Sequence, residues 1–313
     1  MESSREALDA DAPAVSPRSR SSGACRFVDG CMRAYAALPP AARALVESAH
    51  RRECAVRWVL DSNRLEHCGT QDLGSTRAAL LRATAGRSLP ESETVATMVA
   101  LELLFARLAE KRDELGRGAE REERLDALLQ TVDGILELHG ALLAHEGVGG
   151  GRAGTYRTGD AHPGDAPRSL YCTPSRIETE LYAAVDAHNS AVRALAASGD
   201  AAACETSSAV GLGARLLYAV LRVHPFGDGN GRLARLLLAA TLHGHHPVAL
   251  SIPITTEADR LRYLEALRAA DEGGPAAFDA LVAVIADASV GLWTGVRLEV
   301  ERAGFVWPEF VKE

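Results

Sequence analysis

The sequence predicts an all-α fold with one glycine-rich interruption. Aromatic residues make up only 5% of the 313 residues, whereas alanine and leucine are abundant, and this composition favours helices over strands. Apolar residues recur at i, i+3 and i+4 spacing along most of the chain beyond residue 41. Residues 147–168 break this periodicity with seven glycines and two prolines, which predicts a loop, either a short hairpin or a flexible linker between helical halves.

Composition, charge and cysteine usage argue against several classes of protein. A formal net charge of -8 disfavours a general nucleic-acid or anionic-membrane binder. The six cysteines form no Cys-x-x-Cys pair, so they indicate reduced thiols rather than a zinc site or a disulfide scaffold. The chain shows no signal-peptide pattern and no apolar run approaching about 20 residues. We therefore expect a cytoplasmic protein with neither nucleic acid nor membrane among its partners.

The chain divides into four expected segments. Residues 1–25 are polar with little apolar periodicity, which predicts a disordered leader. Residues 26–140 form an N-terminal helical region, residues 141–293 a second helical domain, and residues 294–313 a C-terminal tail without an assignable role. Within these segments we expect helices over about 45–62, 92–105, 125 to near the glycine run at 147–151, 173 onward, 205–222, 230–243, 257–270 and 275–292.

A glycine-rich turn joins two of these helices. Residues 224–231 read His-Pro-Phe-Gly-Asp-Gly-Asn-Gly, and three glycines in five positions let the backbone turn tightly and approach a ligand closely. The next helix is expected to begin at about Asn230. Its unpaired N–H groups and the positive end of its dipole then face the turn, which predicts a phosphate site.

The side chains around this turn suit a magnesium polyphosphate. Arg232 and Arg235 lie one helical turn apart and can clamp phosphates, while Asp228 can hold Mg²⁺. His224 is the nearby side chain that can take a proton at neutral pH. Each residue alone has an ordinary explanation, as a helix-end histidine, a turn aspartate or solvated arginines. Their coincidence with an N-terminal anion site favours the functional interpretation.

Residues 224–235 match every position of the Fic signature, His-x-Phe-x-(Asp/Glu)-Gly-Asn-Gly-Arg-x-x-Arg, so the chain resembles the Fic family. The resemblance covers roughly residues 150–290. It implies an all-α Fic-type domain with a short β-hairpin flap. It also implies transfer of AMP from Mg·ATP to a Ser, Thr or Tyr hydroxyl of a target protein, with Mg²⁺ as cofactor and a homodimer as the expected assembly.

The resemblance also implies roles for the motif residues. His224 would deprotonate the target hydroxyl, Phe226 would anchor the loop in the core, and Asp228 would bind Mg²⁺. A lysine at position 231 would resemble the Doc-like kinase branch, so Gly231 indicates nucleotidyl transfer. The residues expected to bind or support the ATP phosphates are Gly229, Asn230, Gly231, Arg232 and Arg235.

Outside the motif, the resemblance assigns a flap and one aromatic contact. Thr155, Tyr156 and Arg157 look like the family's flap hairpin, which aligns the target segment. Tyr263 resembles an aromatic residue near the nucleoside, although a tyrosine on a partly buried helix face explains it equally well.

A second pattern resembles the family's inhibitory motif, (Ser/Thr)-x-x-x-Glu-(Gly/Asn). Ser62 and Glu66 fit its first five positions and share one face of a helix expected over about 45–67. The resemblance implies that Glu66 pairs with Arg232 and blocks the ATP γ-phosphate. Taken alone, the pattern also describes an exposed helical glutamate near a serine. His67 replaces the expected Gly or Asn, so the helix is expected to end one or two residues late.

Together these observations predict an auto-inhibited protein adenylyltransferase that uses ATP and modifies a hydroxyl-bearing protein. Two alternatives stay open. The same scaffold could remove AMP or transfer UMP or phosphocholine, or the chain could be a non-catalytic regulator that binds nucleotide.

Overall fold

The computed structural model describes residues 17–85, 92–114, 130–146, 153–162, 171–197, 206–273 and 276–308. Every regular element in these ranges is helical, which confirms the all-α fold. The N-terminal part contains α1 (Pro17–Ala37), α2 (Pro40–Leu45), a π-helical turn (Val46–His50), α3 (Arg51–Glu66), α4 (Leu73–Ala85) and α5 (Glu93–Glu114). The remaining α-helices are α7 (Val132–Leu142), α8 (Ile177–Ala197), α9 (Thr206–Val223), α10 (Asn230–Thr241), α11 (Glu257–Glu272) and α12 (Asp279–Arg302).

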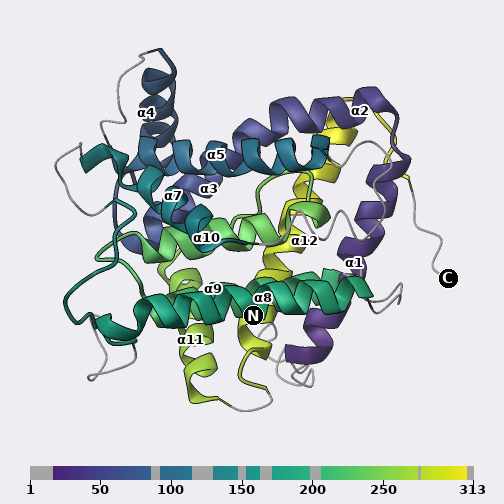
Figure 1. Ribbon diagram of the computed structural model, residues 1–313. Coiled ribbons are helices and arrows are strands. Elements are labelled where there is room, and N and C mark those ends of the chain that lie inside the picture. The colour runs from purple at the N-terminus through teal and green to yellow at the C-terminus, as the bar shows by residue number, and fades with distance from the viewer. Residues whose placement is uncertain are drawn as a thin grey trace, which may run out of the picture.

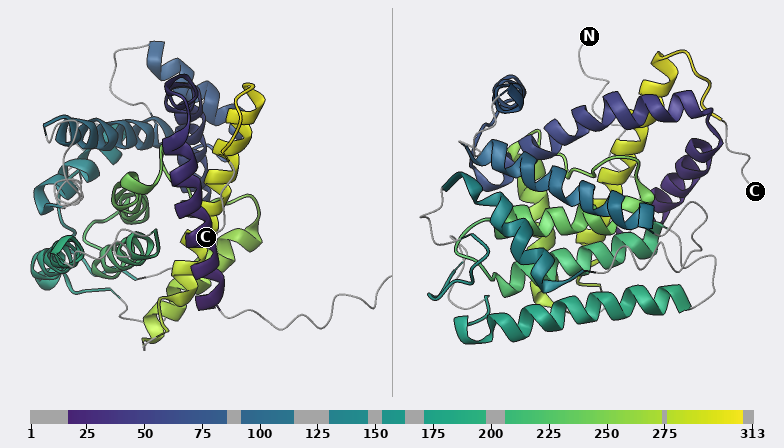
Figure 2. Two further views of the ribbon diagram at one scale, coloured as in Figure 1. Left: turned by 90° about the vertical axis from the view of Figure 1, so that its right-hand side faces the viewer. Right: turned by 45° about the horizontal axis from the view of Figure 1, so that its top comes forward.

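Helix α10 lies at the centre of the fold. It packs against α9 and α7 and is covered by α3 and α5 from the N-terminal part of the chain, as Figures 1 and 2 show. Every residue of α10 except Gly231 is buried, including two arginines. A helix enclosed in this way by apolar neighbours is held in place on all sides, so its N-terminus can serve as a rigid binding site.

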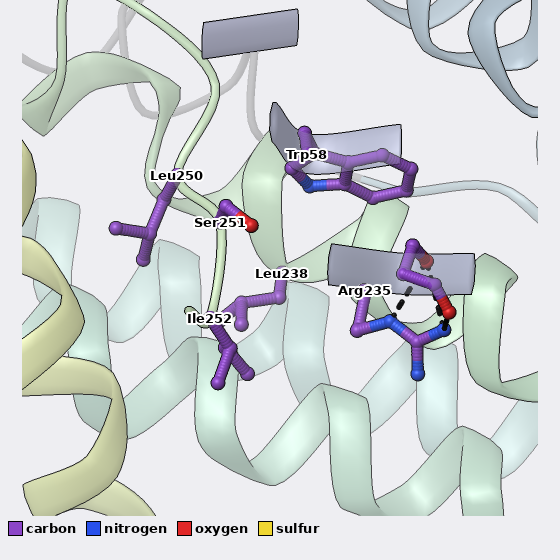
Figure 3. A pocket seen from close by; sticks show the side chains of 7 residues that line it. Trp58, Arg235, Leu238, Leu250, Ser251 and Ile252 are labelled. Atoms are coloured by element: carbon purple, nitrogen blue, oxygen red, sulfur yellow. Dashed lines mark hydrogen bonds between the residues drawn. The ribbon is translucent and has the colours of Figure 1, made fainter. Parts of the chain in front are cut away.

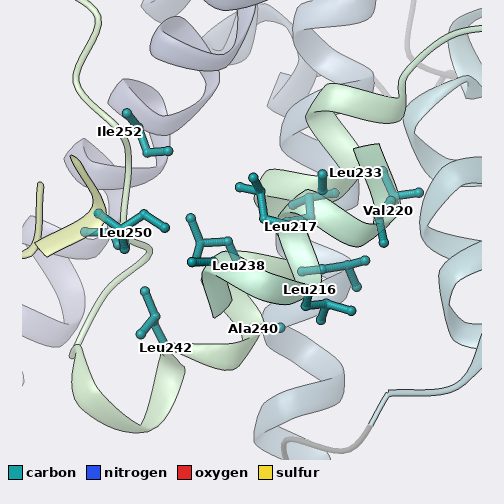
Figure 4. Close-up of a cluster of buried hydrophobic side chains, with 14 of the residues drawn as sticks. Leu216, Leu217, Val220, Leu233, Leu238, Ala240, Leu242, Leu250 and Ile252 are labelled. Carbon is teal, nitrogen blue, oxygen red and sulfur yellow. The ribbon is translucent and has the colours of Figure 1, made fainter. Parts of the chain in front are cut away.

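The main core is formed where α9, α10 and the segment after α10 meet. Leu216, Leu217 and Val220 of α9 face Leu233 of α10, and all four are at most 2% exposed. Figure 4 shows these side chains gathered in one cluster with Leu250 and Ile252 from the segment that follows α10. Burial of side chains of this size contributes about 1.5–3 kcal/mol each.

The expected disordered leader is wrong for residues 17–25, because α1 already begins at Pro17; residues 1–16 lie outside the described residues. The reason is that α1 buries an apolar face against α12, where Val28 and Cys31 meet Trp293 and Val296. The serines and arginines of this helix concealed its periodicity in the sequence.

The expected C-terminal tail is likewise partly helical. Helix α12 continues to Arg302, well beyond the predicted end at residue 292. The tail then brings Trp307 to 6.5 Å from Trp293 in an edge-on ring contact. These residues therefore complete the smaller core around α1 and α12.

Helix α12 is also the one described helix that is long and apolar enough to cross a membrane, judged by length and composition alone. Half of its most apolar stretch is buried inside the fold, where it packs against α1, α9 and α11. A core helix passes the same test, so this feature is weak evidence for a membrane span.

The helix predicted from about residue 125 to near residue 147 begins only at Val132 in the described residues and ends at Leu142, with residues 115–129 outside them. Thr131 explains the start, because its hydroxyl accepts a hydrogen bond from Gly134 N and caps the helix. This boundary sets the position of His139, which contacts the glycine-rich turn.

Candidate functional site

Helix α10 begins at Asn230, as predicted. Gly229 precedes it in the left-handed conformation, with φ of 76°, which glycine adopts without strain. The Asn230 side chain closes the turn, because its Oδ1 accepts from Phe226 N at 3.0 Å and its Nδ2 donates to Phe226 O at 2.8 Å. The first N–H groups of α10 lack partners within the helix and face the turn, an arrangement that favours anions at helix N-termini in general.

Phe226, the residue expected to anchor the turn, lies in the core beneath it. Its ring is fully buried and stacks on the imidazole of His139 from α7, with ring centroids 3.6 Å apart. His139 was missed by the sequence analysis, because nothing in its own segment marks it and 89 residues separate it from Asp228. Only the packing of α7 against α10 brings the two together.

His139 fixes the backbone of the turn through both ring nitrogens. Nδ1 accepts from Gly154 N at 3.0 Å, so the ring proton lies on Nε2, which donates to Asp228 O at 3.0 Å. Burial lowers the pKa of His139 to about 4, so the imidazole is neutral at pH 7. A neutral histidine whose two ring nitrogens are both hydrogen-bonded to the backbone suits a positioning role.

His224 lies at the end of α9 with a left-handed backbone, φ of 48°. Burial lowers its pKa to about 4, so this imidazole is also neutral at pH 7. Nδ1 lies 3.3 Å from Leu221 O, and a neutral ring can only donate to a carbonyl. The lone pair is therefore on Nε2, and the ring of Tyr171 covers one face of the imidazole at 3.8 Å.

Asp228 presents a half-exposed carboxylate beside the start of α10. Its Oδ1 accepts from Gly229 N at 2.6 Å, and its Oδ2 accepts from Arg232 Nη2 at 3.2 Å. The part of the chain that the structure describes holds no group of three His, Cys, Asp or Glu side chains that could bind a metal by themselves. A single carboxylate matches the way Mg²⁺ is held together with substrate phosphates.

Arg232 is buried, with a side chain that is only 1% exposed. Besides Asp228, it pairs with Glu93 at the start of α5, with Nη2 and Oε1 3.3 Å apart. Glu93 was not foreseen from the sequence, since a glutamate in the first turn of a helix is ordinarily explained by the helix dipole.

Glu66 pairs with Arg235, and the expectation that it pairs with Arg232 is wrong. Arg235 Nη1 donates to Glu66 Oε1 at 2.9 Å, while Nε and Nη2 donate to Ser62 Oγ at 3.0 and 2.8 Å. The face of α3 that carries Ser62 and Glu66 packs on the second turn of α10, whereas Arg232 in the first turn faces Asp228 and Glu93. Figure 3 shows Arg235 with its hydrogen bonds across this interface.

The Glu66 carboxylate also lies against the first turn of α10. A β-carbon placed on Gly231 would come within 2.0 Å of Glu66 Oε1 and 2.8 Å of its Cδ. The carboxylate therefore takes the position in which an anionic ligand would meet the helix N-terminus.

Helix α3 ends at Glu66 itself, so the expected late end is wrong. His67 adopts the left-handed conformation, with φ of 53°, that Gly or Asn favours after a helix. Cys68 N donates to Asn63 O at 3.1 Å and His67 N to Arg64 O at 3.4 Å, which is the Schellman pattern of a helix end. His67 therefore takes the backbone conformation expected of the family's Gly or Asn.

Two side chains dock α3 onto the segment before α11. The buried Asp61 accepts from Ser251 Oγ at 2.7 Å and from Ile254 N at 3.1 Å. Arg64 Nη1 donates to Ile254 O at 2.8 Å. The gap beside Trp58, seen in Figure 3, leaves no room for a water molecule, so α3 lies tightly against the core.

The expected β-hairpin flap is not seen: residues 153–162 contain no strand, and residues 163–170 lie outside the described part of the chain. Instead Arg157 binds the glycine-rich turn, because its N donates to Pro225 O at 2.9 Å and its Nε to His224 O at 2.7 Å. Tyr156 packs near the ring of Phe226. Thr155 and its neighbours are thus held beside the motif without a paired strand.

Tyr263 is 3% exposed in α11, and its environment includes both Arg235 and Glu66. Burial raises the pKa of its hydroxyl. The residue is packed in the core beneath the site, and a nucleoside contact stays a prediction.

Comparison with known proteins gives a consistent result. The sequence pattern of the Fic/DOC family matches residues 129–242, which include α7, α9 and α10. A Fido domain-containing protein of Dictyostelium discoideum is 30% identical over 118 residues, or 38% of this chain and 71% of that protein. The protein adenylyltransferase Fic of Culex quinquefasciatus is 28% identical over 260 residues, or 80% of this chain and 44% of that protein.

Solved structures share the fold. A Fic domain containing signaling protein from Bacteroides thetaiotaomicron superimposes with a TM-score of 0.63 at 22% identity, covering 92% of this chain and all of that one. Fic-1 residues 134–508 from C. elegans give a TM-score of 0.61 at 20% identity, covering 92% and 74%. This chain spans less than half the length of the Culex adenylyltransferase.

Proposed function

Since this chain belongs to the Fic/DOC family, we propose that it is a protein adenylyltransferase whose resting state is inhibited by Glu66. The proposal is that AMP passes from ATP to a Ser, Thr or Tyr hydroxyl of a target protein. One observation carries it: a neutral histidine with a free Nε2 lies beside a helix N-terminus that is flanked by two buried arginines.

In this mechanism His224 is the general base. Its Nε2 takes the proton of the target hydroxyl while the hydroxyl oxygen attacks the α-phosphorus of ATP. The bond from the α-phosphorus to the bridging oxygen breaks, and pyrophosphate leaves with the electron pair. A positioned base of this kind contributes roughly 10²–10⁴-fold to the rate.

The N-terminus of α10 would hold the phosphates. Asn230 and Gly231 would offer backbone N–H groups, Gly229 would add its own after leaving Asp228 Oδ1, and Arg232 with Arg235 would supply positive charge. Asp228 would hold Mg²⁺, which neutralises phosphate charge when bound. The half-exposed position of Asp228 beside the helix start supports this assignment.

The remaining assignments concern the target and the nucleoside. We assign Thr155, Tyr156 and Arg157 to alignment of the target. This assignment is supported by Arg157, which donates hydrogen bonds to the carbonyl oxygens of His224 and Pro225. Tyr263 is assigned to the adenosine side of the site, beside Arg235.

Inhibition follows from competition for one place. The Glu66 carboxylate holds Arg235 and lies against Gly231, so the phosphates of ATP cannot take their productive position until it leaves. The proposal therefore predicts that removing this carboxylate activates the enzyme.

The reaction can be tested by the position of the label. In the Glu66→Gly variant, [α-³²P]ATP should label the protein and [γ-³²P]ATP should not, because pyrophosphate leaves. His224→Ala in the same background should abolish labelling while leaving the thermal unfolding curve unchanged. Preferential labelling by [α-³²P]UTP would replace AMP by UMP, and γ-labelling would indicate phosphoryl transfer. Retained ATP binding without any label would favour a regulatory protein.

A further inference from the structure

Arg232 is buried without being fully partnered. Its side chain is 1% exposed, yet neither Nε nor Nη1 has a hydrogen-bond partner. Only Nη2 is engaged, by Asp228 Oδ2 at 3.2 Å and by Glu93 Oε1 at 3.3 Å. A buried guanidinium with two free donor groups is costly to maintain, which indicates that these donors await an anionic ligand.

Glu93 connects this arginine to the end of α3. Its Oε1 meets Arg232, and its Oε2 accepts from Gly69 N at 3.0 Å in the loop that follows α3. The next residue, Thr94, accepts from Asn63 Nδ2 and from Thr70 N through its hydroxyl. The first residues of α5 thus contact both the loop after α3 and Arg232.

The two arginines of the site are therefore both neutralised by acids from the N-terminal helices. Glu66 of α3 pairs with Arg235, and Glu93 of α5 pairs with Arg232. The two carboxylates come from different helices but are joined through the short loop that contains Gly69. Displacing α3 would move this loop and so disturb the Glu93 contact.

We propose that Glu93 is a second inhibitory carboxylate, which competes with substrate phosphate for Arg232 and is coupled to Glu66 through the loop after α3. This inference rests on the proposed function, since it assigns Arg232 to the phosphates of ATP. Release of both carboxylates removes the Glu66 contact from Arg235 and the Glu93 contact from Arg232, whereas release of Glu66 alone leaves Arg232 paired with Glu93.

The test measures affinity for Mg·ADP, a probe that binds without being a substrate, by titration calorimetry. Glu93→Gln in the Glu66→Gly background should tighten Mg·ADP binding by about tenfold, because a charged competitor for a charged donor is removed. Gln keeps an oxygen to accept from Gly69 N, so the fold is retained. Glu93→Gln alone should have a smaller effect, because Glu66 still covers Gly231.

Glu299→Gln is the matched control, since it removes one negative charge from an exposed pair with Arg302 on α12. It should leave Mg·ADP affinity unchanged. Unchanged or weaker binding in Glu66→Gly/Glu93→Gln would overturn the inference and make Glu93 a residue that only positions Arg232. Failure of Glu66→Gly to incorporate label from [α-³²P]ATP would instead refute the proposed function, independently of what the Mg·ADP titrations report about Glu93.

Discussion

The Glu66 carboxylate fills the space that a side chain at Gly231 would need: a β-carbon on Gly231 would lie 2.0 Å from Glu66 Oε1. The Glu66 carboxylate can approach the first turn of α10 so closely only because position 231 has no side chain. The same free space is what a phosphate group needs to reach the backbone N–H groups.

Gly231→Ala should therefore remove inhibition without creating activity. In the Glu66→Gly background the added methyl group should weaken Mg·ADP binding by about tenfold or more, since it blocks hydrogen bonds to a charged ligand. Titration calorimetry measures this directly. Ala at Gly211 of α9, where a β-carbon meets no atom within 4 Å, is the control. Equal Mg·ADP affinity of Glu66→Gly with and without Gly231→Ala would show that the phosphates bind elsewhere.

His67→Gly should stabilise the end of α3. A histidine at φ of 53° carries strain that glycine avoids, so the free energy of unfolding should rise by about 0.5–1 kcal/mol. In a chain of this size that corresponds to about 1–3 °C in Tm. Labelling should not increase, because Glu66 stays in place. His67→Ala should give no stabilisation, and a gain equal to that of glycine would contradict the conformational explanation.

The pH dependence follows from His224, whose pKa is lowered by burial from 6.5 to about 4. The base is then neutral over the physiological range. The labelling rate of Glu66→Gly should stay level from pH 8 to about pH 5 and fall as the pH approaches 4. Because folding favours the neutral imidazole, His224 contributes to stability above the pKa that it has in the unfolded chain. This contribution is lost as the pH falls toward and through the lower pKa that it has in the folded protein.

Tyr171 should control this pKa, because its ring covers one face of the imidazole. Tyr171→Ala admits water and should move the pKa of His224 upward, toward 6.5, as followed by NMR of the imidazole resonances. Tyr171→Phe keeps the stack and should leave the value unchanged. If the pKa of His224 stayed the same in both variants, residues other than Tyr171 would be responsible for its burial.

Asp61 should hold α3 on the core. Asp61→Ala leaves the Ser251 hydroxyl and Ile254 N without their acceptor, which should destabilise the fold by about 1–3 kcal/mol. Labelling should rise at temperatures below unfolding, because α3 is held less firmly. Ser251→Ala is the milder matched variant, and it should lower Tm less while shifting labelling in the same direction. Destabilisation without any rise in labelling would separate α3 docking from inhibition.

The start of α10 at Asn230 was predictable, because the glycine-rich turn and the apolar helix that follows it are both determined by residues adjacent in the sequence. The burial of Phe226 followed from the same motif. The helical leader was not predictable, since α1 is stabilised by its contact with α12 and its own polar residues hide its apolar face.

The pairing across the site depends on tertiary packing. Whether Glu66 meets Arg232 or Arg235 is decided by how α3 lies on α10, which no local pattern contains. His139 and Glu93 reach the turn from α7 and α5, and nothing in their own segments marks them. Within residues 153–162, where the hairpin was expected and no strand is described, Arg157 N instead donates to Pro225 O of the turn.

The most direct test of the central claim compares initial rates of labelling by Mg·[α-³²P]ATP in the wild-type chain and in Glu66→Gly. Removing the charged contact between Glu66 and the buried Arg235 should raise the rate by about tenfold or more. Labelling of Glu66→Gly should disappear again with His224→Ala. Equal rates in wild type and in a folded Glu66→Gly variant would contradict the account.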